Sequence, residues 1–225
     1  VQPALAQSER AAIGSGVLPA ADNSAERPIR FAAEVPASGV LAIPMAGAND
    51  LSRVPAGLVD VVQAAVVGAD FKAKADQTLN LYGVGGYRRV LLVGVAEGDL
   101  DAVALANIGG RVAQATRTDA APVAIMAQGL STKLANPGAY VARGVGLGQW
   151  RFDRLKTVDR TAPPVDAITV VAPDGAGQAF AREHAGLVDG MRLARDLITL
   201  PSNLKYPESF VAAARAAFQG SRTPA

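Results

Sequence analysis

The chain has 225 residues, half of them hydrophobic but only 5% aromatic, and its 22 basic and 20 acidic side chains leave a net charge of +2. This near balance gives no electrostatic reason to expect nucleic acid or a membrane surface as a partner. The sequence has no cysteine, which excludes disulfides, thiolate zinc sites and a cysteine nucleophile, and it has no run of about 18 apolar residues that would predict a membrane span.

Residues 1–29 are rich in Ala, Ser, Gly and Pro without sustained periodicity, which predicts a mobile leader. Within it, Pro3-Ala4-Leu5-Ala6-Gln7 has the Ala-x-Ala pattern that precedes a signal-peptide cleavage point. Two interpretations stand side by side: the tail of a secretory signal, which would make the protein periplasmic, or an alanine-rich disordered leader.

Six short apolar or alternating runs, bounded by turn residues, are the predicted strands. They cover residues 30–35, 39–45, 77–82, 89–95, 122–127 and 167–172. The run RVLLVGV over residues 89–95 is almost wholly apolar, and we expect it at the centre of the sheet.

Helical spacing of apolar residues, with capping residues at the ends, predicts five helices. They cover residues 58–67, about 101–117, 137–152, 178–200 and 208–218. Asp99 or Asp101 is expected to cap the second helix, and Asn136 the third. The buried stripe of the second helix is expected to be Leu105, Ile108, Val112 and Ala115. Gly109 and Gly110 lie inside that helix, and close packing against the sheet would explain them.

Strands and helices alternate along most of the chain. This order predicts an α/β fold of three layers, a largely parallel sheet with helices on both faces.

Two glycine-rich segments resemble ligand loops only superficially. Gly83-x-Gly85-Gly86 precedes a strand, whereas a dinucleotide fingerprint follows one and opens a helix, so a tight turn is predicted. Gly144-x-Gly146-x-Gly148 lies inside a helical pattern and lacks the Gly-Lys-Ser/Thr ending of a phosphate loop. It is predicted to be a stripe of small residues where the helix packs tightly, with a phosphate-cradling loop as the alternative.

His184 is the only histidine, and it lies on the apolar stripe of its predicted helix. A packed or interfacial role is predicted, because one histidine without cysteine makes no transition-metal site. The acidic residues lack ligand spacing for a metal; they include Asp50, Asp60, Asp70 and Asp76. The basic pairs Arg88-Arg89 and Lys72-x-Lys74 are predicted to be solvated surface.

A joint between two helices is predicted over residues 191–210. Arg192 and Asp196 are four residues apart and can pair along one helix face. Met191, Ala194 and Ile198 fall near the opposite face. Pro201 ends this helix, and Pro207 opens the next, followed by Glu208 in its first turn.

This joint carries a resemblance. Ala194-Arg195-Asp196-Leu197, Pro201-x-Asn203 and Pro207-Glu208 resemble the segment that joins the two domains of the leucyl aminopeptidase (cytosol aminopeptidase) family. The resemblance extends back through Trp150-Arg151-Phe152 and residues 89–95 to Tyr82-Gly83. Thr199 and Tyr206 depart from the family pattern, and Tyr206 is a poor N-cap.

The resemblance implies an N-terminal, non-catalytic domain related to macro domains, in a parent enzyme that removes N-terminal residues, leucine among them, from peptides. It implies two divalent metals, Mn or Zn, in a second domain, assembly into a hexamer, and a cytoplasmic location. We expect a leader over residues 1–29, a macro-like domain over 30–174, a linker helix over 175–200 and the start of the catalytic domain over 201–225.

The family string Asn-Thr-Asp-Ala-Glu-Gly-Arg-Leu is absent from the sequence. We therefore expect no catalytic, substrate-binding or metal residue in this chain, and expect it to be inactive alone. Phe210, Val211, Ala214 and Phe218 form an apolar stripe that favours a missing second domain as partner. Two alternatives remain: a free-standing module that binds a nucleotide or ADP-ribose, and a pseudo-enzyme that pairs with a complete aminopeptidase.

Overall fold

The computed structural model describes residues 26–153, 155–156 and 166–218. Contacts divide the chain into two units. We call them the sheet unit, residues 24–151 and 161–188, and the helical unit, residues 1–23, 152–160 and 189–225. The predicted leader lies outside the described ranges up to residue 25, and so does the possible signal tail. Within the described ranges no helix has the length and apolar character needed to cross a bilayer.

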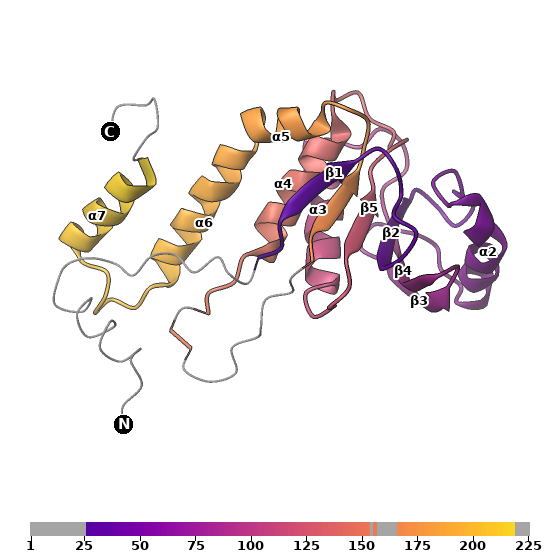
Figure 1. The fold of residues 1–225 in the computed structure, drawn as a ribbon, viewed down its shortest axis with the longest axis horizontal. Coiled ribbons are helices and arrows are strands. Elements are labelled where there is room, and N and C mark those ends of the chain that lie inside the picture. Colours follow the sequence, from indigo (N-terminus) through magenta and orange to yellow (C-terminus); the bar gives the residue numbers. More distant parts are fainter. Residues whose placement is uncertain (1–25, 154, 157–165, 219–225) are drawn as a thin grey trace. The chain divides into compact units, whose positions relative to one another are not determined.

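A single six-stranded sheet forms the sheet unit, in the order β1-β6-β5-β2-β4-β3 (Figure 1). All neighbouring strands are parallel except β3 and β4, which form an antiparallel hairpin at one edge. The predicted fold class, a largely parallel sheet with helices on both faces, is confirmed. The strands are β1 (Ile29–Ala32), β2 (Val40–Met45), β3 (Thr78–Val84), β4 (Tyr87–Gly94), β5 (Val123–Met126) and β6 (Ile168–Val171).

The centre of the sheet is β2 and β5, not β4 as predicted. Strand β4 lies next to the edge strand β3. All residues of β2 and β5 are buried, and so are residues 89–94 of β4. Since all three strands are apolar runs covered on both faces, hydrophobicity alone does not determine their order.

Side chains alternate between the two faces of the sheet and feed two separate cores. Leu91 and Val93 join one core, together with α3 (Ala102–Ala115), α4 (Pro137–Gln149) and the start of α5 (Ala176–Glu183). Val90 and Leu92 join the other, under α2 (Val59–Gly68) and the 3-10 turn η1 (Ala56–Leu58). Figure 1 shows α3 and α4 together on one side of the strands and α2 on the other.

Helices α3 and α4 meet through four glycines, which we call the glycine seam: Gly109 and Gly110 on α3, Gly144 and Gly148 on α4. A methyl group at Gly109 would overlap the carbonyl oxygen of Val141, and one at Gly144 would overlap that of Ala106. The predicted tight packing of small residues on α4 is therefore confirmed for Gly144 and Gly148 against α3, whereas Gly146 lies against Val188 of α6 (Ala185–Thr199). The prediction for α3 was wrong in its partner, since these glycines admit α4 and not the sheet.

The ends of α3 and α4 differ from prediction in detail. The Asp101 carboxylate accepts hydrogen bonds from the N–H groups of Val103 (3.0 Å) and Ala104 (2.8 Å), so it is the cap of α3. Asn136 precedes α4 in a left-handed conformation, φ 53°, without a side-chain cap bond. At the other end α4 stops at Gln149, because Trp150 is extended and cannot continue it.

The long helix predicted over residues 178–200 is two helices, α5 and α6 (Ala185–Thr199). They divide at His184, whose backbone leaves the helical region at φ −126°. Apolar residues continue at helical spacing through this point, so the sequence pattern does not reveal the break.

In the helical unit, α7 (Pro207–Phe218) begins with Pro207 as predicted. Tyr206 has no capping side chain, but its N–H donates to the Ser209 hydroxyl at 3.0 Å. This is one half of a capping box, with serine at the position where Glu or Gln is usual. The described ion pair of Arg192 is with Asp189, three residues earlier on α6, at 2.8 Å.

Candidate functional site

Ligands of open α/β sheets bind beyond the carboxyl ends of the strands, where successive connections pass to opposite faces. Here that point lies between β2, which leads to α2 on one face, and β5, which leads to α4 on the other. Arg53 fills it. Its Nε donates to the carbonyl of Pro44 at 2.9 Å and its Nη1 to that of Gly129 at 2.8 Å.

Asp50 forms an ion pair with Arg53 at this position. Its carboxylate also accepts from the Ala46 N–H at 2.9 Å and from the Ser52 hydroxyl at 2.6 Å. Burial would raise the pKa of Asp50, but the hydrogen bonds from Ser52 and Ala46 and the charge of Arg53 outweigh it and lower that pKa. The usual ligand position of this architecture is thus occupied by the chain's own charged pair.

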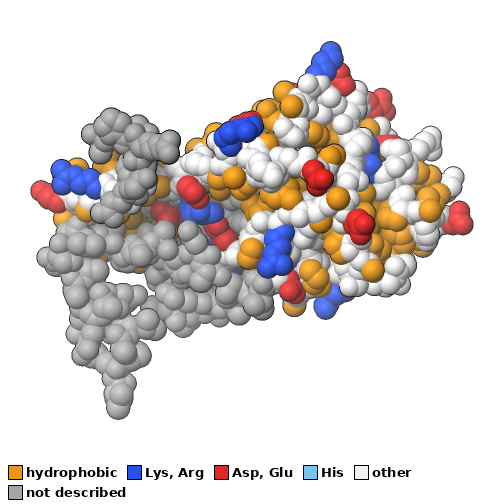
Figure 2. Space-filling view, turned by 45° about the horizontal axis from the view of Figure 1, so that its top comes forward, with side chains coloured by type: hydrophobic (Ala, Val, Ile, Leu, Met, Phe, Trp, Pro, Cys, Tyr) orange, Lys and Arg blue, Asp and Glu red, His pale blue; other side chains and the backbone are white. Residues whose placement is uncertain are grey.

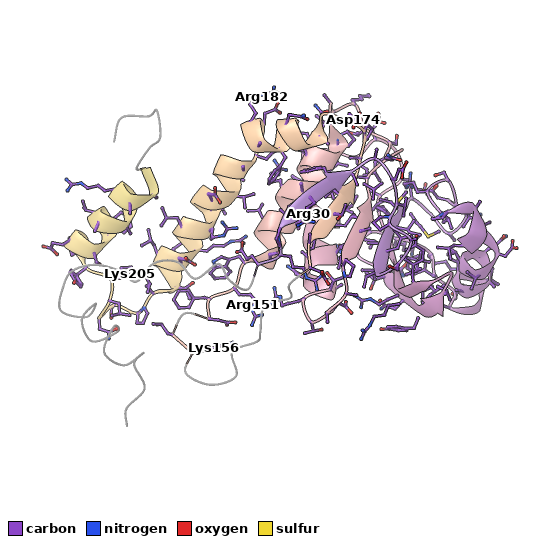
Figure 3. The ribbon with its side chains drawn as sticks, viewed as in Figure 1. Arg30, Arg151, Lys156, Asp174, Arg182 and Lys205 are labelled. Atoms are coloured by element: carbon purple, nitrogen blue, oxygen red, sulfur yellow. The ribbon has the colours of Figure 1, made fainter. Side chains whose placement is uncertain are left out.

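A hollow of about 760 Å³ lies beyond the ends of β1 and β6, where α5 begins. Most of its lining is apolar, with Phe31 and Ala172 among the residues, and Asp174 and Gln178 supply charge and hydrogen bonding. Figure 3 shows Asp174 where α5 begins and Arg182 on the outer side of that helix. The carboxylate of Asp174 offsets the positive end of α5, so the hollow is unsuited to a phosphate group.

The segment Gly83-x-Gly85-Gly86 is the turn of the β3–β4 hairpin, as predicted. Gly85 and Gly86 both have positive φ, 57° and 83°, which is the requirement of a two-residue type I′ turn. The Leu58 side chain lies against Gly85 and leaves no room for a side chain there. The turn is therefore structural and packs under η1.

His184 is packed, as predicted. Its side chain is 6% exposed, and its ring lies 4.6 Å, centroid to centroid, from the ring of Tyr140 on α4. Burial, and then the nearby charge of Arg143, lower the pKa of His184, while Glu183 opposes them. A neutral imidazole in this position has neither a nucleophile nor a carboxylate to orient it, so it does not form a hydrolytic triad with the described residues.

The predicted acidic and basic residues are dispersed over the sheet unit. Asp99 accepts from the Ser131 hydroxyl at 2.9 Å, Asp70 pairs with Lys72, and Asp76 pairs with Arg111. Over the described ranges no three His, Cys, Asp or Glu side chains come together in a way that could hold a metal ion. These residues therefore do not fit the two divalent metals that the resemblance implies.

Arg89 was predicted to be solvated but is only 9% exposed. It points from β4 to the end of α3, where it pairs with Asp119 and donates to the Ala115 carbonyl at 3.1 Å. Arg88, its neighbour, is exposed. Because successive residues of a strand point to opposite faces, Arg89 lies on the α3 side of the sheet and Arg88 on the α2 side.

Sequence reasoning missed Arg27, which falls in the segment predicted to be a mobile leader. It is 5% exposed, and its guanidinium donates to the Ala121 carbonyl at 3.0 Å. Its backbone N–H donates to Gln149 Oε1 at 2.7 Å, and Gln149 Nε2 donates back to the Arg27 carbonyl at 3.2 Å. This pair fixes the chain entering β1 to the end of α4. An arginine beside a proline, in Arg27-Pro28, gives no signal of burial.

On the face drawn in Figure 2, the charged side chains of the described residues are scattered, with opposite signs adjacent and apolar atoms between them. Such a surface lacks the single-sign stripe that binds nucleic acid. It agrees with the net charge of +2.

Comparison with known proteins identifies relatives of this chain. Residues 44–159 match the cytosol aminopeptidase family, N-terminal domain. A probable cytosol aminopeptidase of a Bradyrhizobium species is 34% identical over 169 residues, 71% of this chain and 34% of that protein. The chain thus spans about a third of the length of the curated relatives it matches.

Two solved structures share the fold. A tomato leucine aminopeptidase mutant superposes with a TM-score of 0.72 at 20% identity, over 90% of this chain and 44% of that one. The bottromycin maturation enzyme BotP in complex with Mn gives a TM-score of 0.60 at 21% identity, over 84% of this chain and 36% of that one. At these identities the likeness concerns the fold alone.

Proposed function

This chain belongs to the cytosol aminopeptidase family, as an N-terminal domain, and we propose that it serves as the non-catalytic part of a metal-dependent aminopeptidase. The observation that carries the proposal is the family match over residues 44–159. The parent enzyme would release N-terminal residues from peptides, leucine among them. The catalytic residues would lie in the portion of the relatives that this chain does not cover.

Two divalent metals, manganese or zinc, are proposed for that catalytic portion. Manganese is bound by BotP, which shares this fold. In hydrolysis, such a pair supplies an activated water and polarises the scissile carbonyl. The described residues of this chain do not fit a metal pair, so their contribution would be structural.

The structural contribution we propose is assembly of the enzyme, as a hexamer, and a border at the active-site entrance. Helix α7 supports a docking role, because Phe210 and Val211 leave an apolar surface exposed on it. The boundaries that we predict, 30–174 for the domain and 175–200 for the linker, belong to the same proposal. The names of the relatives favour a cytoplasmic enzyme.

A nucleotide-binding function is not favoured. Arg53 and Asp50 occupy the usual ligand position at the ends of β2 and β5, and the hollow beside α5 has a carboxylate at its helix end.

The test compares hydrolysis of leucyl amide by this chain and by the full-length parent protein, each purified and supplied with Mn²⁺. We expect metal-dependent release of leucine by the full-length protein and none by the chain alone. Release of leucine by the pure chain, abolished by a chelator, would overturn the proposal of a non-catalytic part. Absence of activity in the full-length protein would overturn the aminopeptidase proposal.

A further inference from the structure

His184 lies at the break between α5 and α6, and it connects the two helices. Its N–H donates to the Phe180 carbonyl at 2.9 Å, and its own carbonyl accepts from the Val188 N–H at 3.0 Å. One residue therefore belongs to the hydrogen bonding of both helices. The backbone of His184 therefore links the last turn of α5 to the first turn of α6.

The ring is held against α4. It lies 4.6 Å from the Tyr140 ring, with an angle of 58° between the planes. Further along α4, a methyl group at Gly146 would come within 2.7 Å of the Val188 side chain, so α4 and the start of α6 are in close contact. The His184 ring and Val188 together dock the junction of α5 and α6 on α4.

This position suits a neutral ring and not a charged one. The Nε2 atom is buried and has no hydrogen-bond partner within the described part of the chain. A neutral imidazole tolerates this as an unpaired acceptor, whereas an imidazolium would bury an N–H donor and a charge. Desolvation of an unpaired charge is among the most costly events in a protein interior.

The charges around the ring also favour its neutral form on balance. Arg143 reaches from α4 and lies 5.2 Å from the centroid of the Tyr140 ring. On α5, Glu183 is the neighbouring acid, but Arg182 pairs with it at 2.7 Å. Tyr140 is the other titratable group on α4 beside the ring, and residues 185–188 at the start of α6 carry none. Burial and Arg143 lower the pKa of His184 below its usual value of 6.5, and Glu183 only partly opposes them.

We propose that His184 is an acid-sensitive switch: its neutral ring keeps the junction of α5 and α6 docked on α4, and protonation of the ring releases that junction. This inference goes beyond the proposed aminopeptidase function and does not depend on it.

The sign of the effect follows from proton linkage. The released ring has an ordinary pKa near 6.5, and the docked ring has a lower one. The released state therefore binds more protons as the pH falls below 6.5, so acid favours release and docking is fully stable above that pH. Once the pH is below both values, release becomes about tenfold more frequent for each pH unit by which the two pKa values differ.

The first measurement is the proton NMR titration of the His184 ring in the 225-residue chain. Because the sequence has one histidine, the ring signal needs no assignment. We expect a midpoint below 6.5 in the folded chain and near 6.5 in urea. A midpoint at or above 6.5 in the folded chain would overturn the proposal without any variant being made.

The second measurement is hydrogen exchange at pH 5 and pH 7.5, corrected for the intrinsic pH dependence of exchange. Amides of α5 and of the first turn of α6 are expected to lose protection at pH 5, while those of β2 and β5 keep theirs. Equal protection at the two pH values, or simultaneous loss of protection over the whole sheet, would contradict a local switch.

Two variants separate the ring charge from the ring packing. In His184→Phe an aromatic ring remains that does not titrate, so the difference in protection between the two pH values should disappear. In Arg143→Met the ring remains titratable without the neighbouring cation, so the pKa of His184 should rise toward 6.5. An unchanged pKa of His184 in Arg143→Met, together with acid-induced release in His184→Phe, would refute the switch.

Discussion

The two faces of the sheet are packed by opposite means. On the α3–α4 face, the glycine seam removes side chains so that two helices approach to backbone contact. On the α2 face, large side chains such as Leu58, Val62 and Phe71 fill the space between one helix and the strands. The seam fails when an atom is added, and the packing under α2 fails when atoms are removed. The cost of a substitution therefore depends on which of these two kinds of contact the residue makes.

The largest effect is expected from adding one carbon to the seam. Gly144→Ala places a methyl group on the Ala106 carbonyl, which must separate α3 from α4 and should lower the free energy of unfolding by about 4 kcal/mol or more. The matched control is Gly68→Ala at the end of α2, which has no atom within 4 Å of the new methyl group. It should change stability by less than about 1 kcal/mol. Urea unfolding of both variants measures this, and equal stability would refute the seam.

On the opposite face the expected effect comes from removal. Leu58→Ala empties a buried position under α2 and should cost about 2–3 kcal/mol in a urea titration. Val67→Ala, at a side chain that is 75% exposed on α2, the helix that follows Leu58, should cost less than about 0.5 kcal/mol. If the two variants unfolded at the same urea concentration, α2 would not be packed as described.

A smaller effect is expected at the margin of the α3 face. Asp119→Asn takes the charge partner from buried Arg89 and should cost roughly 1–2 kcal/mol in thermal or urea unfolding. Asp70→Asn removes the partner of exposed Lys72, and it should cost under about 1 kcal/mol. An Asp119 variant as stable as the Asp70 variant would show that Arg89 finds other partners.

The smallest effect is a pH dependence on the α2 side, at Asp50. Its pKa is lowered in the folded chain, so below the ordinary value of 3.8 the unfolded chain takes up the proton first. The stability that Asp50 supplies is present above pH 3.8 and is lost as the pH falls through its folded pKa. Unfolding measured from pH 5 to pH 2.5 should show a shallower decline in Asp50→Asn than in the wild type. An identical decline would assign the acid sensitivity to other carboxylates.

Much of this architecture could be predicted from local pattern. All six strands and the first three helices lie near their predicted positions, because apolar runs and capping residues such as Asp101 act over a few residues. What could not be predicted depends on partners distant in sequence. The burial of Arg89 requires Asp119, that of the Arg27 guanidinium requires the Ala121 carbonyl, and the seam requires knowing that Gly109 faces α4.

The candidate site divides in the same way. The turn at Gly85 and the packed state of His184 follow from local spacing and composition. The position of Arg53 could not be predicted in this way, because it depends on where β2 and β5 end in space. The helix break at His184 could not be predicted from the sequence, because Phe180, Leu187 and Val188 continue the apolar stripe on both sides of it.

The pairing of β1 with β6 has a consequence for synthesis on the ribosome. Ile29 and Ile168 are in register as neighbours, so the first strand emerges about 140 residues before the strand that receives it, a delay on the order of ten seconds. During that interval β1 has no strand to pair with, and β2 to β5 are able to form a sheet whose open edge is β5. An open edge of this kind is a template for pairing with another nascent chain. In the finished domain the edge on this side is β1, which has only four residues, and such a short edge strand is a poor template for further pairing.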